Sequence, residues 1–169
     1  MDRPEFESHE ALGGVVLLTP EGYKRLHDEL EHLTTVKRHE IAERLRESKD
    51  HGEFAEDNSE LDETKFEQAM VESRITELKT IFSNAQVLDA DHIPTDEVGV
   101  GSVVKVMDVD RKFDFEVRIV SSIEANPDED LISNESPMGL ALMGASKDEV
   151  VEFVAPAGKL RYQIVSISK

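Results

Sequence analysis

Two long stretches of helical hydrophobic spacing, joined by a short turn that contains Gly52, constrain this chain more than any other feature. In the first stretch, apolar residues recur along one helix face at Leu26, Leu30, Leu33, Ile41 and Leu45. The second stretch carries a heptad seam that becomes polar toward the turn: Leu61, Thr64, Gln68, Val71, Ile75, Leu78, Phe82 and Ala85. Because the connection is short, the helices must be antiparallel neighbours, which predicts a coiled-coil hairpin about 40 Å long.

The first helix has a clear start. Thr19 suits the N-cap position, Pro20 suits the first helical position, and Glu21 lies where a negative charge interacts favourably with the helix dipole. Nothing breaks the stripe until Gly52. The sequence therefore predicts one uninterrupted helix from Pro20 to Lys49.

The chain changes character after Asn84. Short segments rich in valine and isoleucine predict strands at residues 102–107, 113–120, 150–154 and 160–167. A short helix is expected around Leu142, and residues 132–139 are interpreted as a loop. The predicted fold class is α+β, with an N-terminal antiparallel two-helix coiled-coil hairpin followed by a small antiparallel sheet domain with one short helix.

Three segments follow from these patterns. Residues 1–14 are expected to be a flexible tail, residues 15–88 the hairpin with its tip near residues 50–60, and residues 89–169 the sheet domain. The sequence has no cysteine, and no apolar run approaches the roughly 20 residues that span a bilayer. We therefore expect a cytoplasmic protein without disulfides or membrane contact. A monomer is also expected.

The formal net charge of -18, from 19 basic and 37 acidic residues, argues against free nucleic acid as the primary partner, because a polyanion would be repelled. A basic protein surface or a metal ion fits this charge better. The acids are densest around the predicted tip. Within residues 50–67, Lys65 is the single basic residue, and the acidic residues are Asp50, Glu53, Glu56, Asp57, Glu60, Asp62, Glu63 and Glu67.

Two interpretations of this acidic stretch are open. Composition alone favours the plainer one, in which carboxylates at a helix start cap the helix and face solvent. However, concentrating like charge at the end of a long arm costs stability without supporting a core, which points to a role. Clustered carboxylates would suit a hard cation such as magnesium. The bases near the same end that could touch a phosphate backbone are Arg44, Arg46, Lys49 and Lys65.

Several separated motifs, in order along nearly the whole chain, resemble the bacterial Gre transcript cleavage factors. They are LTPEGYKRLHDELEHL (18–33), HGEFAEDNSELDETKFEQ (51–68), FSNAQVLD (82–89), GSVVKV (101–106), LISNESPMGLALMG (131–144) and PAG (156–158). The resemblance implies an N-terminal coiled coil and a C-terminal domain of FKBP-like fold.

The resemblance also implies a function. Such factors dock their C-terminal domain on bacterial RNA polymerase and pass the coiled coil through its secondary channel. Two tip acids there help to hold a Mg²⁺ ion shared with the polymerase active site, next to the 3′ end of the nascent RNA. The polymerase then hydrolyses its own backtracked RNA. We therefore expect a factor that stimulates an enzyme, in agreement with a sequence that has no nucleotide-binding glycine loop, zincin pattern or nucleophile elbow.

The resemblance assigns roles to particular residues. Glu53 is the first tip acid, and the second is Glu56 or Asp57, because this sequence holds one extra residue before Asn58. Lys65 matches a basic position that lies toward the RNA in the family. The loop that contacts the polymerase is matched by Glu135, Ser136 and Pro137.

Two other functions stay open at this point. The altered tip leaves room for a Gre-like inhibitor that occupies the secondary channel without stimulating cleavage. The FKBP-like resemblance raises a peptidyl-prolyl isomerase or chaperone, although fold alone is weak evidence for function. The sheet domain also offers few aromatic residues for a proline pocket, namely Phe113, Phe115, Phe153 and Tyr162.

Overall fold

The computed structural model describes residues 14–52 and 59–169. These residues form two compact units, one made of residues 23–85 and the other of residues 15–22 together with residues 86–169. The first unit is a helical hairpin and the second is built around a sheet, so the predicted fold class is confirmed. Of the predicted tail, only Gly14 is among the described residues. The domain limits drawn from the sequence stay a prediction.

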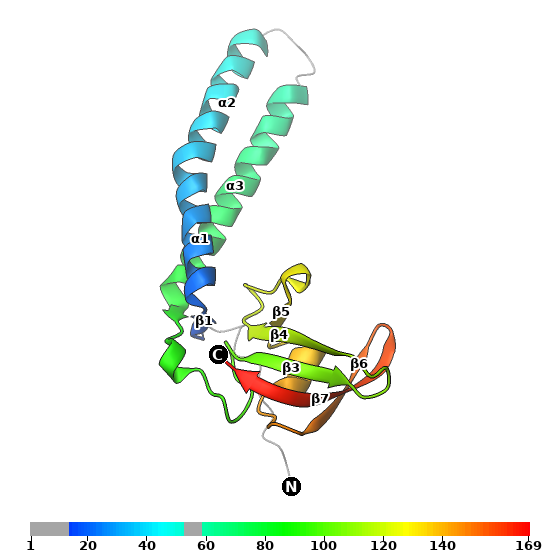
Figure 1. The fold of residues 1–169 in the computed structure, drawn as a ribbon. Helices are drawn as coiled ribbons and strands as arrows, with labels where there is room; N and C mark the ends of the chain where they lie inside the picture. Colours follow the sequence, from blue (N-terminus) through cyan, green and yellow to red (C-terminus); the bar gives the residue numbers. More distant parts are fainter. Residues whose placement is uncertain (1–13, 53–58) are drawn as a thin grey trace. The chain divides into compact units, whose positions relative to one another are not determined.

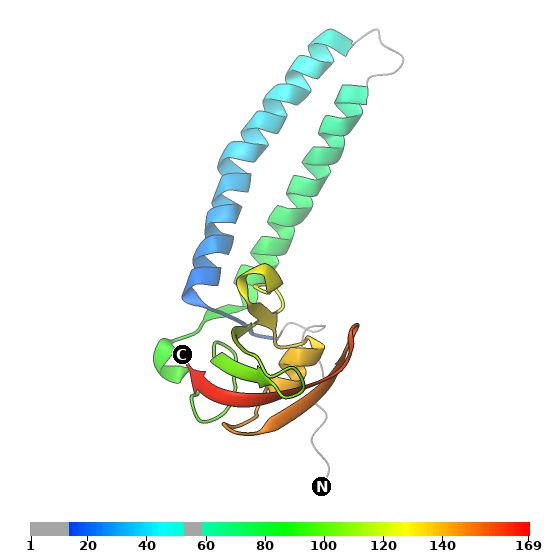
Figure 2. The same ribbon diagram turned by 45° about the vertical axis from the view of Figure 1, so that its right-hand side comes forward.

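The hairpin consists of two helical arms. The first arm runs without a gap through α1 (Pro20–His32), a π-helical turn (Leu33–Lys37) and α2 (Arg38–Gly52). The second arm is α3 (Ser59–Asn84). The arms run side by side in opposite directions (Figure 1; Figure 2), as the short connection requires. Within the described part of the chain, no helix combines the length and the apolar character needed to cross a membrane.

The π-helical turn interrupts what the sequence predicts as one α-helix, so that prediction is wrong at residues 33–37. Two threonines supply the physical reason. The Thr34 hydroxyl donates to the carbonyl oxygens of Leu30 (2.8 Å) and Glu31 (3.1 Å), and the Thr35 hydroxyl donates to that of Glu31 (2.7 Å). Hydroxyl groups on these carbonyl oxygens compete with the regular backbone bonds and favour a local change in winding.

The two arms bury one narrow seam. Its buried apolar side chains come from both arms and are Leu26, Ile41, Ile75, Leu78 and Ile81. The seam becomes polar toward the turn, as predicted, where Ser48 and Thr64 are buried. Gln68 departs from the predicted heptad, because it is exposed and the neighbouring Glu67 is half-buried.

The predicted start of α1 is confirmed at Thr19, whose hydroxyl oxygen accepts a hydrogen bond from the backbone N–H of Gly22 (3.0 Å). A second group joins this N-cap from far along the chain. The buried carboxylate of Glu124 accepts from the backbone N–H of Thr19 (2.8 Å) and from its hydroxyl (2.5 Å). The sequence holds one signal of this contact, a glycine inside the first helical turn, where glycine is a poor helix former.

The sheet unit holds five strands in the order β5-β4-β3-β7-β6. They are β3 (Val103–Asp108), β4 (Asp114–Val120), β5 (Leu131–Ser133), β6 (Val150–Ala155) and β7 (Gly158–Ser168). β3 lies at the centre and pairs antiparallel with β4 and β7, and β6 pairs antiparallel with β7. The predicted strands are therefore confirmed, as is the short helix, α4 (Pro137–Leu142). Short 3-10 turns occupy Ala90–His92 and Pro127–Glu129.

One strand of this sheet departs from the prediction. Part of the segment interpreted as a loop forms β5, which pairs parallel with β4, so the sheet is mixed. A strand of three residues is too short to show an alternating pattern, which is why the sequence did not reveal it. Two further short strands, β1 (Val16–Leu18) and β2 (Ala85–Val87), pair with each other.

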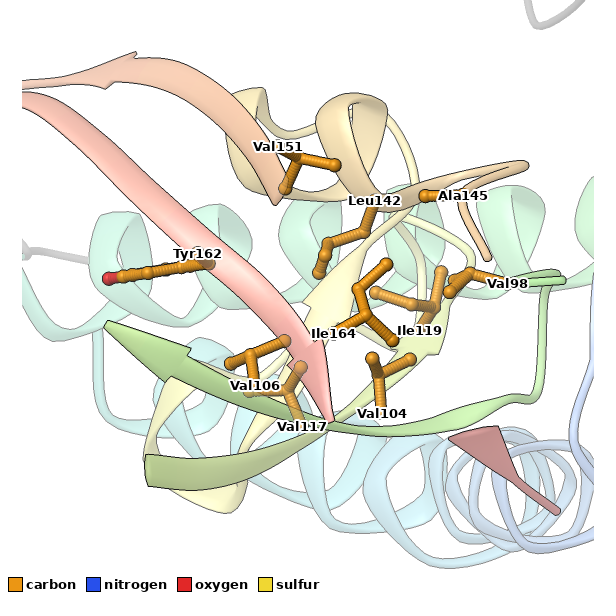
Figure 3. Packing of buried hydrophobic residues seen from close by; sticks show 10 residues of the cluster. All are labelled: Val98, Val104, Val106, Val117, Ile119, Leu142, Ala145, Val151, Tyr162 and Ile164. Atoms are coloured by element: carbon orange, nitrogen blue, oxygen red, sulfur yellow. The ribbon is translucent and has the colours of Figure 1, made fainter. Parts of the chain in front are cut away.

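A single hydrophobic cluster forms the core of the sheet unit (Figure 3). Its buried members come from β3, β4, β6, β7, α4 and adjoining loops: Val98, Val104, Val106, Val117, Ile119, Leu142, Ala145, Val151, Tyr162 and Ile164. Burial alternates along β3, where Val104 and Val106 are buried and Lys105 is not. This period of two is the pattern from which the strand was predicted.

The alternation predicts unequal effects for one chemical change. Val106→Ala removes buried methyl groups from a side chain that is 0% exposed, and it should lower the free energy of unfolding by about 2 kcal/mol. Val154→Ala on β6 is the matched control, since Val154 is 70% exposed, and it should cost less than about 1 kcal/mol. Urea denaturation of both variants measures the difference. Equal losses would show that the core is not where the structure places it.

Candidate functional site

The predicted metal-holding acids Glu53, Glu56 and Asp57 lie outside the described residues, in the segment that connects Gly52 at the end of α2 with Ser59 at the start of α3. Their placement therefore stays a prediction. Their chemistry can be judged from the donors alone. All are carboxylates, and carboxylate oxygens are the ligands that a hard cation such as Mg²⁺ prefers. The donor set thus fits magnesium.

Small polar side chains are buried near the helix ends that flank this segment. Ser48 of α2 and Thr64 of α3 are buried, and the Thr64 hydroxyl donates to the carbonyl oxygen of Glu60 (2.8 Å). The distance between two packed helices depends on the size of the side chains at their contact. Small residues at this level therefore let the helices lie close together just before the acidic segment begins.

Arg44, which the sequence analysis grouped with the bases near the tip, is engaged within the hairpin. It forms a hydrogen-bonded ion pair with Glu67 of α3, and the Lys37 ammonium lies 3.7 Å from the same carboxylate. The hydrogen bond from Arg44, together with both positive charges, lowers the pKa of Glu67. Arg44 thus links α2 to α3 through Glu67.

The other three bases are differently placed. Arg46, Lys49 and Lys65 are all exposed, and none forms an ion pair with another residue in the ranges 14–52 and 59–169. Arg46 and Lys49 lie on the last two turns of α2, and Lys65 lies on the second turn of α3. Three of the four predicted bases therefore have exposed side chains on the two helix ends that flank residues 53–58 in the sequence.

Further from the tip, two arginines link the arms. Arg38 donates two hydrogen bonds to Glu72 (2.7 and 2.8 Å), and Arg74 donates two to Glu29 (2.7 and 3.0 Å). Arg74 also donates to Glu77 on its own helix (2.9 Å). The hydrogen bond from each arginine lowers the pKa of its glutamate across the seam. Paired hydrogen bonds of this kind fix the alignment of the arms because the guanidinium and carboxylate planes must match.

One other group in the described part of the chain brings metal-ligating side chains together. It consists of His27, Asp28 and Glu31 on α1. All three are exposed, and Asp28 already pairs with Lys24 (2.6 Å). Exposed groups of this kind are common without a metal, so we assign no site to them.

The predicted polymerase-contacting loop is built around Ser136. Its hydroxyl donates to the carbonyl oxygen of Ser133 (2.7 Å) and accepts from the backbone N–H of Gly139 (3.0 Å), which caps α4. A side chain on Gly139 would meet the Ser133 carbonyl oxygen at 1.9 Å, so only glycine fits there. Glu135 and Pro137 are exposed on this rigid turn.

An apolar residue next to this turn was missed by sequence reasoning. Leu140 on α4 is 62% exposed, and Met143, one helical turn on, is also exposed. The signal was present in the sequence, since Leu140 and Leu142 on a six-residue helix cannot both face the core. Together, Glu135, Pro137, Leu140 and Met143 form a small surface with an apolar part and a charged part, called here the α4 surface.

The four aromatic residues weighed for a proline pocket pack on one another. Ring centroids lie 5.7 Å apart for Phe113 and Phe115, 5.3 Å for Phe115 and Tyr162, and 5.2 Å for Phe153 and Tyr162. Tyr162 is buried at the centre of this group. Its ring edges and faces are therefore used for core packing, which gives the isomerase interpretation no support.

Comparison with known proteins covers both units. Residues 16–87 match the family described as "Transcription elongation factor, N-terminal", and residues 93–169 match "Transcription elongation factor, GreA/GreB, C-term". The chain is 46% identical over 154 residues to "Transcription elongation factor GreA" of Acetivibrio thermocellus, covering 91% of this chain and 96% of that protein. It is 47% identical over 153 residues to the protein of the same name from Clostridium perfringens, covering 90% and 96%.

The chain therefore belongs to the GreA/GreB family of transcription elongation factors. This confirms the family resemblance drawn from the sequence motifs. Among solved structures, the chain is similar to GreA factor homolog 1 (Gfh1) of Thermus thermophilus, with 34% identity, a TM-score of 0.43, and coverage of 92% of this chain and 99% of that chain. The family assignment rests on the sequence matches.

The ion pairs across the seam predict acid sensitivity of the hairpin. Because the pKa values of Glu29 and Glu72 are lowered in the folded state, both pairs stabilise the hairpin fully above the usual glutamate pKa of 4.5. That stabilisation is lost as the pH falls through the lowered values. The melting temperature, followed by circular dichroism, should therefore fall on acidification from neutral pH to about pH 3.

A variant with Glu29→Gln and Glu72→Gln should show a smaller fall, because it no longer holds the two carboxylates that the arginines keep ionised. The control carries Glu31→Gln and Glu47→Gln, at exposed positions of the first arm. Its melting temperature should change with pH as that of the unmodified protein does. If both variants showed the same pH dependence, the arginine–glutamate pairs would not be the cause of the acid sensitivity.

Proposed function

We propose that this protein stimulates bacterial RNA polymerase to cleave its own backtracked RNA, with the hairpin inserted in the secondary channel and the sheet unit bound outside. One observation carries the proposal. In a member of the GreA/GreB family, the segment joining two antiparallel helices holds Glu53, Glu56 and Asp57. Such work requires a cytoplasmic protein, and a monomer suffices. The hydrolytic chemistry belongs to the polymerase.

The acidic segment supplies metal ligands in this proposal. Glu53, with Glu56 or Asp57, would hold a Mg²⁺ ion that the polymerase active site shares. When bound, such an ion stabilises the attacking water and the leaving oxygen of phosphodiester hydrolysis. Two carboxylates alone hold magnesium weakly, which agrees with a site completed by the partner. The chain's own task is to deliver and hold these carboxylates.

Charge near the tip supports a second role. Arg46, Lys49 and Lys65 are the exposed bases that can face the 3′ end of the nascent RNA, where phosphate contacts position the strand. Arg44 contributes less to such contacts because Glu67 pairs with it. The local charge is thus mixed, although the chain as a whole is strongly acidic.

The α4 surface would contact the polymerase. Protein interfaces commonly combine an apolar centre with a polar rim, and Leu140 with Met143 supplies the apolar part while Glu135 supplies the charge. The hydrogen bonds of Ser136 hold this surface in one conformation. A surface that is already ordered binds without a further loss of conformational entropy.

Removal of the tip carboxylates tests the cleavage role. Glu53→Ala, Glu56→Ala and Asp57→Ala together should abolish RNA shortening by a backtracked elongation complex, while binding to the polymerase persists, because the acids act on the metal and not on docking. RNA length on a sequencing gel and a competition assay for binding measure the two effects. The matched control carries Glu40→Ala, Glu43→Ala and Glu47→Ala, exposed acids on α2, and should cleave like the unmodified protein.

Full cleavage by the tip variant would refute the metal role of these acids. Inhibition of nucleotide addition by the unmodified protein, with no RNA shortening, would instead select the inhibitor. The extra residue before Asn58 is the observation that keeps this second function in view.

The α4 surface gives a separate prediction for docking. Leu140→Ser should weaken polymerase binding by about tenfold, as expected for an apolar side chain at the centre of an interface, with the melting temperature nearly unchanged because the side chain is exposed. Val154→Ser on β6 is the control, since Val154 is also exposed and lies outside the α4 surface. If both variants bind like the unmodified protein, the docking surface lies elsewhere.

A further inference from the structure

Glu124 is a deeply buried carboxylate that the proposed function leaves without a role. It lies in the turn after β4 and is 2% exposed, and its backbone N–H donates to the carbonyl oxygen of Ser121 (3.0 Å). Its two carboxylate oxygens accept from the N–H (2.8 Å) and the hydroxyl (2.5 Å) of Thr19, which is 3% exposed. Burying a charge is costly unless it is paired with donors in this way.

The pattern is that of a capping box divided between two segments. In an ordinary capping box, the N-cap threonine accepts from the N–H three residues later, and a glutamate at that third position reaches back to the N-cap N–H. Here the third position is Gly22, which has no side chain to offer. Its N–H still binds the Thr19 hydroxyl oxygen (3.0 Å), and the glutamate comes from position 124.

The absence of a side chain on Gly22 leaves room for the Glu124 carboxylate. A Cβ atom on Gly22 would lie 1.7 Å from the Glu124 carboxylate oxygen Oε1. The carboxylate therefore occupies the space that a local capping side chain would need. Its negative charge also lies at the positive end of the α1 dipole, where such a charge is stabilised.

The cap lies where the chain passes from the sheet unit into the hairpin unit. Residues 15–22 belong to the sheet unit, whereas α1 continues from Tyr23 onward as part of the hairpin unit, with no break in the helix. Other contacts hold the same few residues to the sheet unit. The N–H of Leu88 donates to the carbonyl oxygen of Leu18 (2.8 Å), and Glu21 lies 3.9 Å from Arg118.

We propose that Glu124 is a positioning residue, whose carboxylate anchors the first turn of α1 to the sheet unit and so restricts the directions that the hairpin can take. A helix whose first turn is fixed transmits that constraint along its length, whereas a free first turn unwinds or pivots. The consequence for RNA cleavage rests on the proposed function above: the sheet unit holds the polymerase, so a loosened α1 misplaces the acidic segment.

The anchoring can be measured on the protein alone. Because the sequence has no cysteine, spin labels can be attached at Glu47→Cys on the hairpin and Lys147→Cys on the sheet unit, both exposed positions. Pulsed electron paramagnetic resonance should give a narrow distance distribution for the labelled parent and a broader one after Glu124→Gln, which places an amide N–H₂ against a Thr19 donor. Glu116→Gln, the same change at an exposed position of β4, should leave the distribution narrow.

The effect on function is measured with the complete chain and a backtracked elongation complex. Glu124→Gln should lower the rate of stimulated cleavage by about tenfold or more, as expected for a misplaced reacting group, while the concentration that half-saturates the polymerase stays unchanged. Thr19→Val should behave likewise, because it loses the hydroxyl. Thr19→Ser keeps both donors and should restore the parent behaviour, a rescue that general destabilisation would not predict.

Several outcomes would overturn the inference. An unchanged distance distribution in both Glu124→Gln and Thr19→Val would show that the cap does not restrain α1. A broadened distribution with undiminished cleavage would separate the anchor from function. Should Glu124→Gln fail to fold, Thr19→Val with its serine rescue decides the question. If the parent itself stimulates no cleavage, the proposed function fails, and the distance measurement still judges the anchor.

Discussion

A pair of helices packed side by side shares just one narrow seam, and the hairpin is organised around this constraint. Ile41, Ile75 and Leu78 are among the few fully buried side chains of the hairpin, and most of the others are exposed or half-buried. The arms therefore need alignment from groups that tolerate solvent, which the arginine–glutamate pairs provide. Exposed pairs add little net stability, so their value lies in fixing which residues face each other. The low apolar content and high charge of the chain follow from the same geometry.

The periodic parts of the fold could be predicted from the sequence because their signals are local. Helical spacing, a heptad seam and alternating valines each need only a short window of residues. Contacts between distant segments leave at most an indirect signal, such as Gly22 in the first turn of α1. Nothing near Thr19 in the sequence names Glu124 as its partner, and nothing in residues 131–133 reveals a parallel neighbour. The π-helical turn could not be predicted from the hydrophobic pattern either, because threonine hydroxyls compete with backbone hydrogen bonds without altering that pattern.

The candidate site was predictable to a different degree. Residue type and resemblance selected the acids and bases near the turn, but charge alone could not tell a base that faces solvent from one engaged by a neighbour. Arg44 is the clear case, since its pairing depends on the register of α2 against α3. Leu140 is the opposite case, because the orientation of α4 decides which of its apolar side chains is exposed. Register and orientation are properties of packing, and a single sequence specifies them only through the whole fold.

The π-helical turn sets the angular phase of everything that follows it in the first arm. Successive residues of an α-helix are about 100° apart around the axis, so a turn closed over five residues instead of four retards the rest of the helix by about that angle. By favouring the π-helical turn, Thr34 and Thr35 set the rotation of α2 about its own axis relative to α1. They thereby decide which side of α2 meets Glu67. A first arm with the same side chains and a different phase would bring another residue than Arg44 to Glu67.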